Sequence, residues 1–294
     1  MKDFFSSLPE GFVSEALALT SPRDASRLSS VNSSFRSAAE WNMVWESFLP
    51  PECLAEEVDR GLDSMKKVYL RLCDHPIIIE DGNKSFWLDK WSGKKCYMLA
   101  AKQLSIALVD SPNCWRWISM AESRFTEVAQ LISVSSLEVS GNVNTSILSP
   151  NTTYVVYLVF MTTTKAYGFE YQPVEVYVGV DNSHTRMVYL DPQAQKRRRL
   201  GPTRRIGSFG RGAFANSNEV PSPSEDNCPK RRDDRWFEVE IGEYFNKGGD
   251  EVEVEMSVTE VKGGNWKTGI IIQGMEIRPK NECEYFDTKR VWEM

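Results

Sequence analysis

The sequence has little of what metal and nucleophilic chemistry requires. Its 294 residues include only two histidines, His75 and His184, and six cysteines, none of which forms a CxxC pair. Such cysteine spacing fits reduced thiols in an intracellular protein better than a disulfide framework or a zinc site. A hydrolase or a metalloenzyme is therefore the weaker expectation. We expect no catalytic residues, no metal and no cofactor.

Long hydrophobic runs and an excess of positive charge are also missing. The longest apolar run, Tyr154 to Met161, has eight residues, whereas a membrane helix needs roughly 20. The N-terminal segment 1–7 lacks the apolar stretch of a secretory signal. The 35 Lys and Arg against 41 Asp and Glu give a net charge of −6, which argues against general nucleic-acid or membrane-surface binding. The 41 % hydrophobic fraction is instead that of a globular chain with one large or two ordinary domains.

The first fifty residues are predicted to form short helices. Apolar side chains recur at helical spacing after Pro9 and again from Trp41 to Phe48. Between these two runs, Ser21 can cap a helix whose first position is Pro22. Three short helices cannot bury much apolar surface by themselves. Either they form a small cap on the rest of the chain, or a partner protein covers them.

Four sequence motifs follow one another in this stretch: Leu8-Pro9-Glu10, Ser21-Pro22-Arg23-Asp24, Val31-Asn32-Ser33-Ser34-Phe35-Arg36 and Val44-Trp45-Glu46-Ser47-Phe48-Leu49-Pro50. Together they resemble an F-box, in the form that plants fuse to a phloem-protein-type lectin domain. The resemblance implies binding to a Skp-type adaptor, which links the chain to a cullin ubiquitin ligase. The residues that it implies for the adaptor contact or its support are Leu8, Pro9, Phe12, Val13, Leu17, Pro22, Leu28, Val31 and Trp45.

A helical connector is expected next, and then a change of period. Residues 51–75 carry apolar side chains at helical spacing, and His75-Pro76 ends the helix because the residue before proline avoids helical angles. From Ile77 onward the pattern is extended. Tyr154 to Phe160 is a continuous apolar run typical of a central strand, and Val252 to Val258 alternates apolar with polar residues. Many short strands without helices predict an antiparallel β-sandwich with a jelly-roll-like arrangement.

Several segments of this second part resemble the phloem protein 2 and tobacco-agglutinin lectin family. The matching segments are 82–99, 101–106, 115–117, 154–160, 236–245 and 265–279. The resemblance covers about residues 76–280. The expected organisation is therefore an F-box at 1–50, a helical connector at 51–75 and a phloem-protein-2-like lectin domain at 76–294.

The lectin resemblance implies a carbohydrate site. An aromatic face covers the apolar side of a sugar, and carboxylates accept hydrogen bonds from its hydroxyl groups. Mapped by the surrounding residues, the family's second tryptophan is Trp115, and its two glutamates are Glu253 and Glu260. The first tryptophan is replaced by Leu108, which has no extended aromatic face. Either the site binds glycans, such as those that contain N-acetylglucosamine, or it is degenerate and binds none.

Glu260 is unusual on its own account. Counting by twos from Val252 places it on the core face of its strand, where an unpaired carboxylate is costly. We expect a β-bulge near Thr259 to turn Glu260 outward, with a pocket-lining position as the alternative. Two carboxylates also raise the glycosidase alternative. Nothing in the sequence specifies their separation, and the lectin resemblance argues against cleavage.

A basic segment interrupts the second domain. Residues 191–235 hold 11 Lys or Arg and six Asp or Glu, so the segment carries +5. Five prolines with scattered glycines and serines predict a mobile loop. Its run Lys196-Arg197-Arg198-Arg199 is either a nuclear-import signal or a solvated charged stretch. RNA binding is disfavoured, because the run lacks interleaved aromatic residues.

The sequence thus predicts a non-catalytic adaptor in the cytoplasm and nucleus. Its F-box would bind a Skp-type subunit and through it a cullin. Its lectin-like domain would capture glycoprotein targets for ubiquitination. The alternative is an F-box adaptor that binds protein targets independently of glycans, and a third reading is a plain lectin whose F-box no longer docks.

Overall fold

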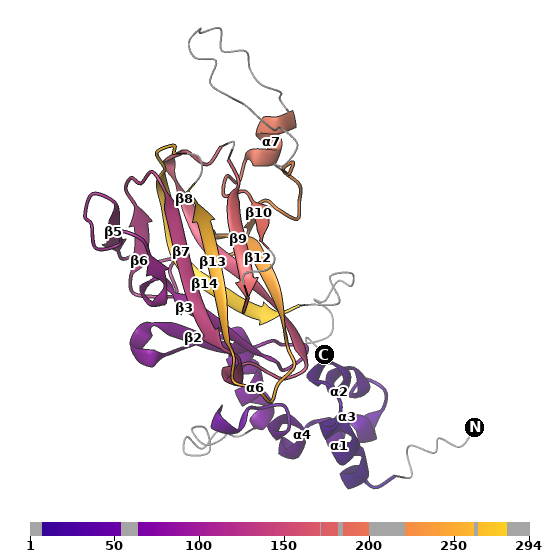
Figure 1. Ribbon diagram of the computed structural model, residues 1–294. Helices are drawn as coiled ribbons and strands as arrows, with labels where there is room; N and C mark the ends of the chain where they lie inside the picture. The colour runs from indigo at the N-terminus through magenta and orange to yellow at the C-terminus, as the bar shows by residue number, and fades with distance from the viewer. Residues whose placement is uncertain are drawn as a thin grey trace, which may run out of the picture. The chain divides into compact units, whose positions relative to one another are not determined.

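The computed structural model describes residues 8–53, 64–170, 172–181, 185–199, 221–261 and 264–280 (Figure 1). The described chain divides into two compact units. One comprises the N-terminal residues up to Ile77 together with Phe86–Cys96, and the other comprises Ile78–Ser85 and Tyr97–Arg278. No helix within these ranges is long and apolar enough to cross a membrane.

The first unit, called the helical unit here, is drawn in indigo and violet in Figure 1. Its helices are α1 (Glu10–Ala18), α2 (Pro22–Leu28), α3 (Ser33–Ala39), α4 (Asn42–Glu46) and α6 (Met65–Asp74). The predicted start of α2 is confirmed, since the Ser21 hydroxyl accepts a hydrogen bond from the Asp24 N–H at 3.1 Å. The end of α6 before His75-Pro76 is confirmed as well. The part of the predicted connector at residues 54–63 lies outside the described residues.

Helix α3 was not expected from the apolar pattern. Its sequence, Ser33 to Ala39, holds only one large apolar side chain, Phe35, so no apolar stripe is visible. The helix is instead started by Asn32, whose side-chain oxygen accepts a hydrogen bond from the Phe35 N–H at 2.9 Å. Its buried residues are the small Ala38 and Ala39, which let α3 pack closely against α1. Within residues 8–50, which the structure describes, four short helices therefore stand where three were predicted for the first fifty.

A loop from the β-rich sequence completes the helical unit. Tyr69 on α6 donates its hydroxyl hydrogen to the backbone carbonyls of Asp89 and Lys90, both at 3.1 Å. The N–H of Arg23 donates to the carbonyl of Trp91 at 3.3 Å. Gly93 has a φ of 70°, and a Cβ there would lie 3.3 Å from the Pro22 ring. The helices and residues 86–96 thus share one core.

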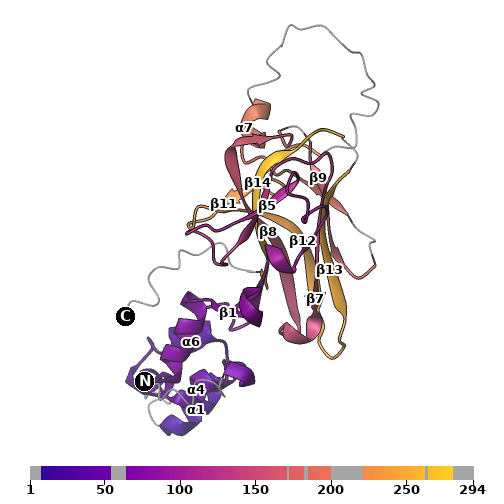
Figure 2. The same ribbon diagram turned by 90° about the vertical axis from the view of Figure 1, so that its left-hand side faces the viewer.

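The strands form two antiparallel sheets, which lie mostly within the second unit, called the β unit here (Figure 2). The first sheet has the order β1 (Ile77–Ile79), β2 (Lys84–Leu88), β3 (Lys95–Ala100), β14 (Thr268–Pro279), β8 (Thr152–Tyr167), β12 (Phe237–Asn246) and β11 (Lys230–Arg231), with β5 (Trp115–Ile118) on β6 (Val128–Leu131) and β6 on β14. The second has the order β10 (Arg186–Val188), β9 (Val174–Gly179), β13 (Glu253–Glu260), β7 (Leu137–Asn144) and β4 (Ser105–Ile106). Single helical turns lie at Glu80–Gly82, Ala101–Gln103 and Thr145–Ile147, and α7 spans Ala194–Arg199.

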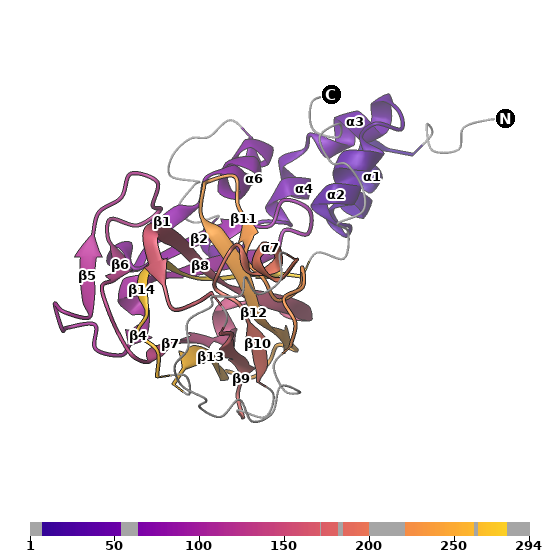
Figure 3. The same cartoon turned by 90° about the horizontal axis from the view of Figure 1, so that it is seen from above.

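The sheets confirm the main strand predictions. Strand β8 lies between β14 and β12, as its continuous apolar run indicated. Strand β13 alternates buried and partly exposed residues from Val254 to Glu260. From the first sheet, β12 packs against β9 and β10 of the second (Figure 3). Helices followed by an antiparallel β unit are thus confirmed, while the jelly-roll-like sandwich stays a prediction.

A charged network lies inside the first sheet. Glu276 on β14 is only 2 % exposed. Its carboxylate accepts hydrogen bonds from Arg232 at 3.1 Å and from Arg278 at 2.8 Å. Arg278 also donates to Glu238 on β12 at 2.6 Å. Burial by itself would raise the pKa of the Glu276 carboxyl, but the charges of Arg232, Arg278 and Arg124 outweigh burial and hold that pKa below its ordinary value.

Candidate functional site

The helical unit exposes large apolar side chains, of which Phe12 is an example at 66 % exposure. On the described helices and the turns between them, the exposed large apolar side chains up to Met43 are Leu8, Phe12, Leu19, Val31, Trp41 and Met43. Of the nine residues predicted for adaptor binding, Leu8, Pro9, Phe12 and Val31 are exposed, Leu28 is half-buried, and Val13, Leu17, Pro22 and Trp45 are buried. The set thus separates into side chains that a partner can reach and side chains that support them from within.

Trp45 is the central support. It is buried, and its indole N–H donates to the carbonyl of Ala39 at 2.7 Å. Its ring packs against Phe48 and Tyr69, with ring centroids 5.8 Å and 5.3 Å away. Because the hydrogen bond ties α4 to the end of α3, Trp45 fixes the positions of both helices.

The structure places two of the predicted carbohydrate residues side by side, but in different environments. Trp115 on β5 is buried, and its indole N–H donates to the carbonyl of Ala107 at 3.0 Å. Leu108 is the residue after Ala107. It is 59 % exposed and has a φ of 62°, which is unusual for leucine. In this arrangement Leu108 reaches solvent, while the Trp115 ring lies in the core.

The two predicted glutamates lie at opposite ends of β13. Glu253 pairs in register with Asn144 and Glu260 with Leu137, so at about 3.3 Å per residue the two backbones are roughly 23 Å apart. Glu253 is exposed, and its carboxylate accepts a hydrogen bond from the Asn144 amide at 3.1 Å. Leu108 is near the Glu260 end, because the neighbouring Ala107 N–H donates to the carbonyl of Glu138. The four residues therefore do not converge on one position.

The expected bulge near Thr259 is wrong. The pairing of β13 with β7 runs without a shift through Thr259 to Glu260. Glu260 stays on the core face and is 5 % exposed. Its charge is met by Lys267, which is 1 % exposed and forms an ion pair with the Glu260 carboxylate. Gln172 donates a further hydrogen bond to it at 3.1 Å. A buried partner replaces the bulge that the sequence pattern suggested.

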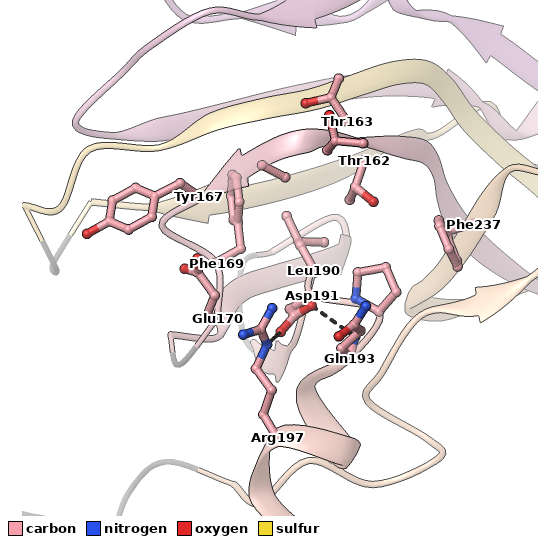
Figure 4. A pocket seen from close by; sticks show the side chains of 13 residues that line it. Thr162, Thr163, Tyr167, Phe169, Glu170, Leu190, Asp191, Gln193, Arg197 and Phe237 are labelled. Atoms are coloured by element: carbon pink, nitrogen blue, oxygen red, sulfur yellow. Dashed lines mark hydrogen bonds and ion pairs between the residues drawn. The ribbon is translucent and has the colours of Figure 1, made fainter. Parts of the chain in front are cut away.

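The β unit also contains a hollow of about 260 Å³ that sequence reasoning missed (Figure 4). Three separate segments line it: residues 162–170, which include the end of β8, residues 190–197 and the start of β12. Asp191 lies on one wall, where its carboxylate accepts hydrogen bonds from the Gln193 N–H at 2.9 Å and from the Arg197 guanidinium at 2.8 Å. Glu170 lies at one end and accepts a hydrogen bond from the Gly168 N–H at 2.8 Å. The run of threonines at 162–164 is the one local signal of the hollow in the sequence.

The predicted basic segment is ordered at both described ends. Helix α7 holds Lys196 and the rest of the basic run to Arg199, and Arg197 is paired with Asp191. At the other end, β11 joins the first sheet. The described ends of the mobile loop predicted for 191–235 thus contain a helix and a strand, residues 200–220 lie outside the described residues, and the mobility stays a prediction.

Comparisons with known proteins agree with this architecture. The family model of phloem protein 2 matches residues 94–279. F-box protein At2g02240 of Arabidopsis thaliana is 41 % identical over 278 residues, covering 94 % of this chain and 80 % of that protein. Putative F-box protein PP2-B12 of the same plant is 42 % identical, covering 94 % and 98 %. F-box protein PP2-B10 is 40 % identical, covering 94 % of both. The chain therefore belongs to the phloem protein 2 family, as one of the plant F-box proteins that carry this domain.

Proposed function

We propose that this chain is the substrate-recognition adaptor of a Skp-cullin-F-box ubiquitin ligase. The helical unit binds the Skp-type subunit, the β unit captures the target, and the chain itself carries out no bond chemistry. The observation that supports this role best is the set of exposed apolar side chains on the helical unit. Small helical units rarely expose such residues unless a partner covers them.

Co-purification tests the adaptor role. The full chain, produced together with a Skp-type adaptor, is expected to form a stable complex. Phe12→Asp places a charge on the exposed surface and is expected to weaken the complex at least tenfold. Glu15→Ala is the matched control, because Glu15 is exposed on the same helix. A folded wild-type chain that forms no complex would support the plain-lectin reading and contradict this one.

The nature of the captured target has two readings. In the first, the β unit binds glycans of glycoproteins through Leu108, Trp115, Glu253 and Glu260. In the second, it binds protein targets independently of glycans. The buried indole ring of Trp115 and the ion pair of Glu260 with Lys267 favour the second reading. Both groups are satisfied inside the fold, so neither is left to contact a sugar.

A glycan array separates these readings. Trp115→Ala is unsuitable as a test, because the loss of a buried tryptophan costs about 3–5 kcal/mol and endangers the fold. Leu108→Trp instead restores an exposed aromatic face. If the first reading holds, the array shows binding to N-acetylglucosamine-containing glycans that Leu108→Trp strengthens. Val180→Trp is the control, since Val180 and Leu108 are both 59 % exposed. A blank array for both variants supports glycan-independent recognition.

We further propose that the protein works in the cytoplasm and the nucleus, with Lys196, Arg197, Arg198 and Arg199 as the import signal. The exposed Lys196 on α7 supports this role. A fluorescent fusion in plant cells tests it. Lys196→Ala with Arg198→Ala is expected to reduce the nuclear fraction, whereas Lys230→Ala with Arg231→Ala should leave it unchanged.

A further inference from the structure

Strand β8 extends well beyond its neighbour β12. The paired residues run from Asn246 with Thr152 to Phe237 with Phe160. Strand β8 continues for seven more residues, Met161–Tyr167, which we call the overhang. Among the residues that the structure describes, no strand is paired with the overhang on the β12 side. Within the described part of the chain, backbone groups along this edge are therefore open to another strand.

The local backbone explains why β12 begins only at Phe237, opposite Phe160 of β8. Arg235 has a φ of 73°, and its N–H donates to the carbonyl of Arg232. The N–H of Arg232 in turn donates to the carbonyl of Trp236 at 2.8 Å. These bonds close a tight turn before Phe237, so the chain leaves the line of β12 at this point. The overhang is a consequence of the turn.

The hollow described above lies along the overhang. Thr162, Thr163, Thr164, Ala166 and Tyr167 form one wall, and the segment from Leu190 to Gln193 faces it. Phe237 stands at the end where the paired strands stop, and Phe169 with Glu170 stands at the other (Figure 4). The hollow is thus a slot in line with β12, bordered on one side by a strand edge.

The overhang has the composition of a strand that accepts a partner. Its sequence, Met-Thr-Thr-Thr-Lys-Ala-Tyr, is rich in residues that favour β-structure and contains no proline. Natural sheets usually protect exposed edges with charges, proline or bulges. Here Lys165 is the one charged residue of the seven. Extended peptides commonly bind by pairing with such an edge, while pockets beside it select their side chains.

The charges of the slot indicate what such a peptide carries. Asp191 is neutralised by Arg197. Glu170 accepts the Gly168 N–H, and within the described part of the chain it forms no ion pair. Counted over its described lining residues, the slot therefore carries one net negative charge, at the Glu170 end. A basic side chain placed there would form a charge-assisted hydrogen bond.

We propose that the slot takes an extended segment of a target protein, which pairs as an added strand with Met161–Tyr167 and places a lysine or arginine against Glu170. This inference rests on the proposed role of the β unit in target capture. It names the edge and the side-chain chemistry through which capture occurs.

Peptide selection followed by hydrogen exchange tests the proposal. The full chain is used to select from a display library of random ten-residue peptides, and the exchange of its backbone amides is measured with and without a selected peptide. Binding is expected to slow exchange at least tenfold at alternate amides of 161–167, because an added strand bonds every second residue of an edge. The amides from Thr152 to Phe160 are expected to stay unchanged.

Two variants and one control sharpen the result. Thr162→Arg fills the slot and is expected to weaken peptide binding at least tenfold. Glu170→Lys reverses the local charge, so selection should change from basic to acidic side chains at one peptide position. Thr153→Arg is the matched control on the same strand, because Thr153 is paired with the exposed Phe245 at the far end of β8. It should bind as the wild type does.

Three results would overturn the proposal. The first is a library that yields no binders to well-folded protein. The second is a set of binders that protect amides elsewhere. The third is protection of 161–167 that rises with protein concentration in the absence of peptide, which would assign the edge to a second copy of this chain. Failure to co-purify with a Skp-type adaptor would contradict the ligase role and leave the slot proposal standing, so the two failures are distinguishable.

Discussion

Single residues show how this chain tolerates charge inside its β unit. Lys267 donates hydrogen bonds to the carbonyls of Ser135 at 3.0 Å and Asn265 at 2.8 Å, in addition to its ion pair with Glu260. Each buried charge is thus met by an opposite charge and by polar groups. Removal of one partner leaves the other uncompensated in a medium of low polarity.

Lys267→Met is therefore expected to lower the free energy of unfolding by about 3–5 kcal/mol. The double variant Glu260→Leu with Lys267→Met is expected to recover most of this loss, because it removes both charges. Urea unfolding followed by tryptophan fluorescence measures both effects. Lys247→Met, at an exposed lysine, should change the free energy by less than about 0.5 kcal/mol. A single variant as stable as the wild type would show that the pair contributes nothing.

Glu276 makes stability depend on pH with a definite sign. The pKa of its carboxyl is lower in the folded chain than the ordinary value of 4.5. Its contribution to the free energy of unfolding is therefore fully present above about pH 4.5 and is lost as the pH falls through the lower pKa of the folded state.

The Glu276→Gln variant is expected to be less stable at pH 7 and to show a shallower loss of stability below pH 4.5. Urea unfolding at a series of pH values measures this slope. Glu251→Gln, at an exposed glutamate, serves as the control and should keep the wild-type slope. If the free energy of unfolding falls equally steeply with pH in the wild type and in Glu276→Gln, the lowered pKa of Glu276 is contradicted.

At the scale of elements, the short helices depend on their first residues. Helix α3 has only seven residues, so its start contributes much of its stability. Asn32→Ala removes the capping hydrogen bond to Phe35 and is expected to cost about 1 kcal/mol. Thermal unfolding of the full chain, monitored by the circular dichroism signal of its helices, measures this loss of stability. Ser30→Ala, at an exposed turn position nearby, should leave the melt unchanged.

The sequence predicted those features that depend only on residues close together in the chain, such as helix caps, helix ends and strand alternation. The cap at Ser21, the end of α6 and the alternation of β13 were all visible in short stretches of sequence. Strand β14 buries the charged Glu276, which pairs with Arg232 from a distant segment of the chain. The partner of Glu260 and the walls of the slot also come from distant segments. No short-range pattern contains such contacts.

On the scale of the whole molecule, the boundary of the helical unit does not follow the sequence order. Tyr69 is fully buried, and burial raises the pKa of its hydroxyl, which therefore stays protonated and donates to Asp89 and Lys90. The helices up to residue 75 thus lack part of their core when residues 86–96 are absent.

A fragment that ends at residue 75 is accordingly expected to melt without a cooperative transition, in contrast to the full chain. In the full chain, Tyr69→Phe removes the hydroxyl that the Asp89 and Lys90 carbonyls share and should cost about 0.5–1.5 kcal/mol. Circular dichroism on heating measures both. A fragment of residues 1–75 that melts as sharply as the full chain would show that the helices are complete by themselves.

This arrangement has a consequence for how such proteins diversify. The chain passes from one unit to the other at residue 78, returns at residue 86 and leaves again at residue 97. A genetic recombination that joined this F-box to an unrelated recognition domain after residue 76 would discard the loop against which Pro22 and Tyr69 pack. New target specificities in this lineage are therefore expected to arise by substitutions and insertions within the β unit, rather than by exchange of one half of the gene for another.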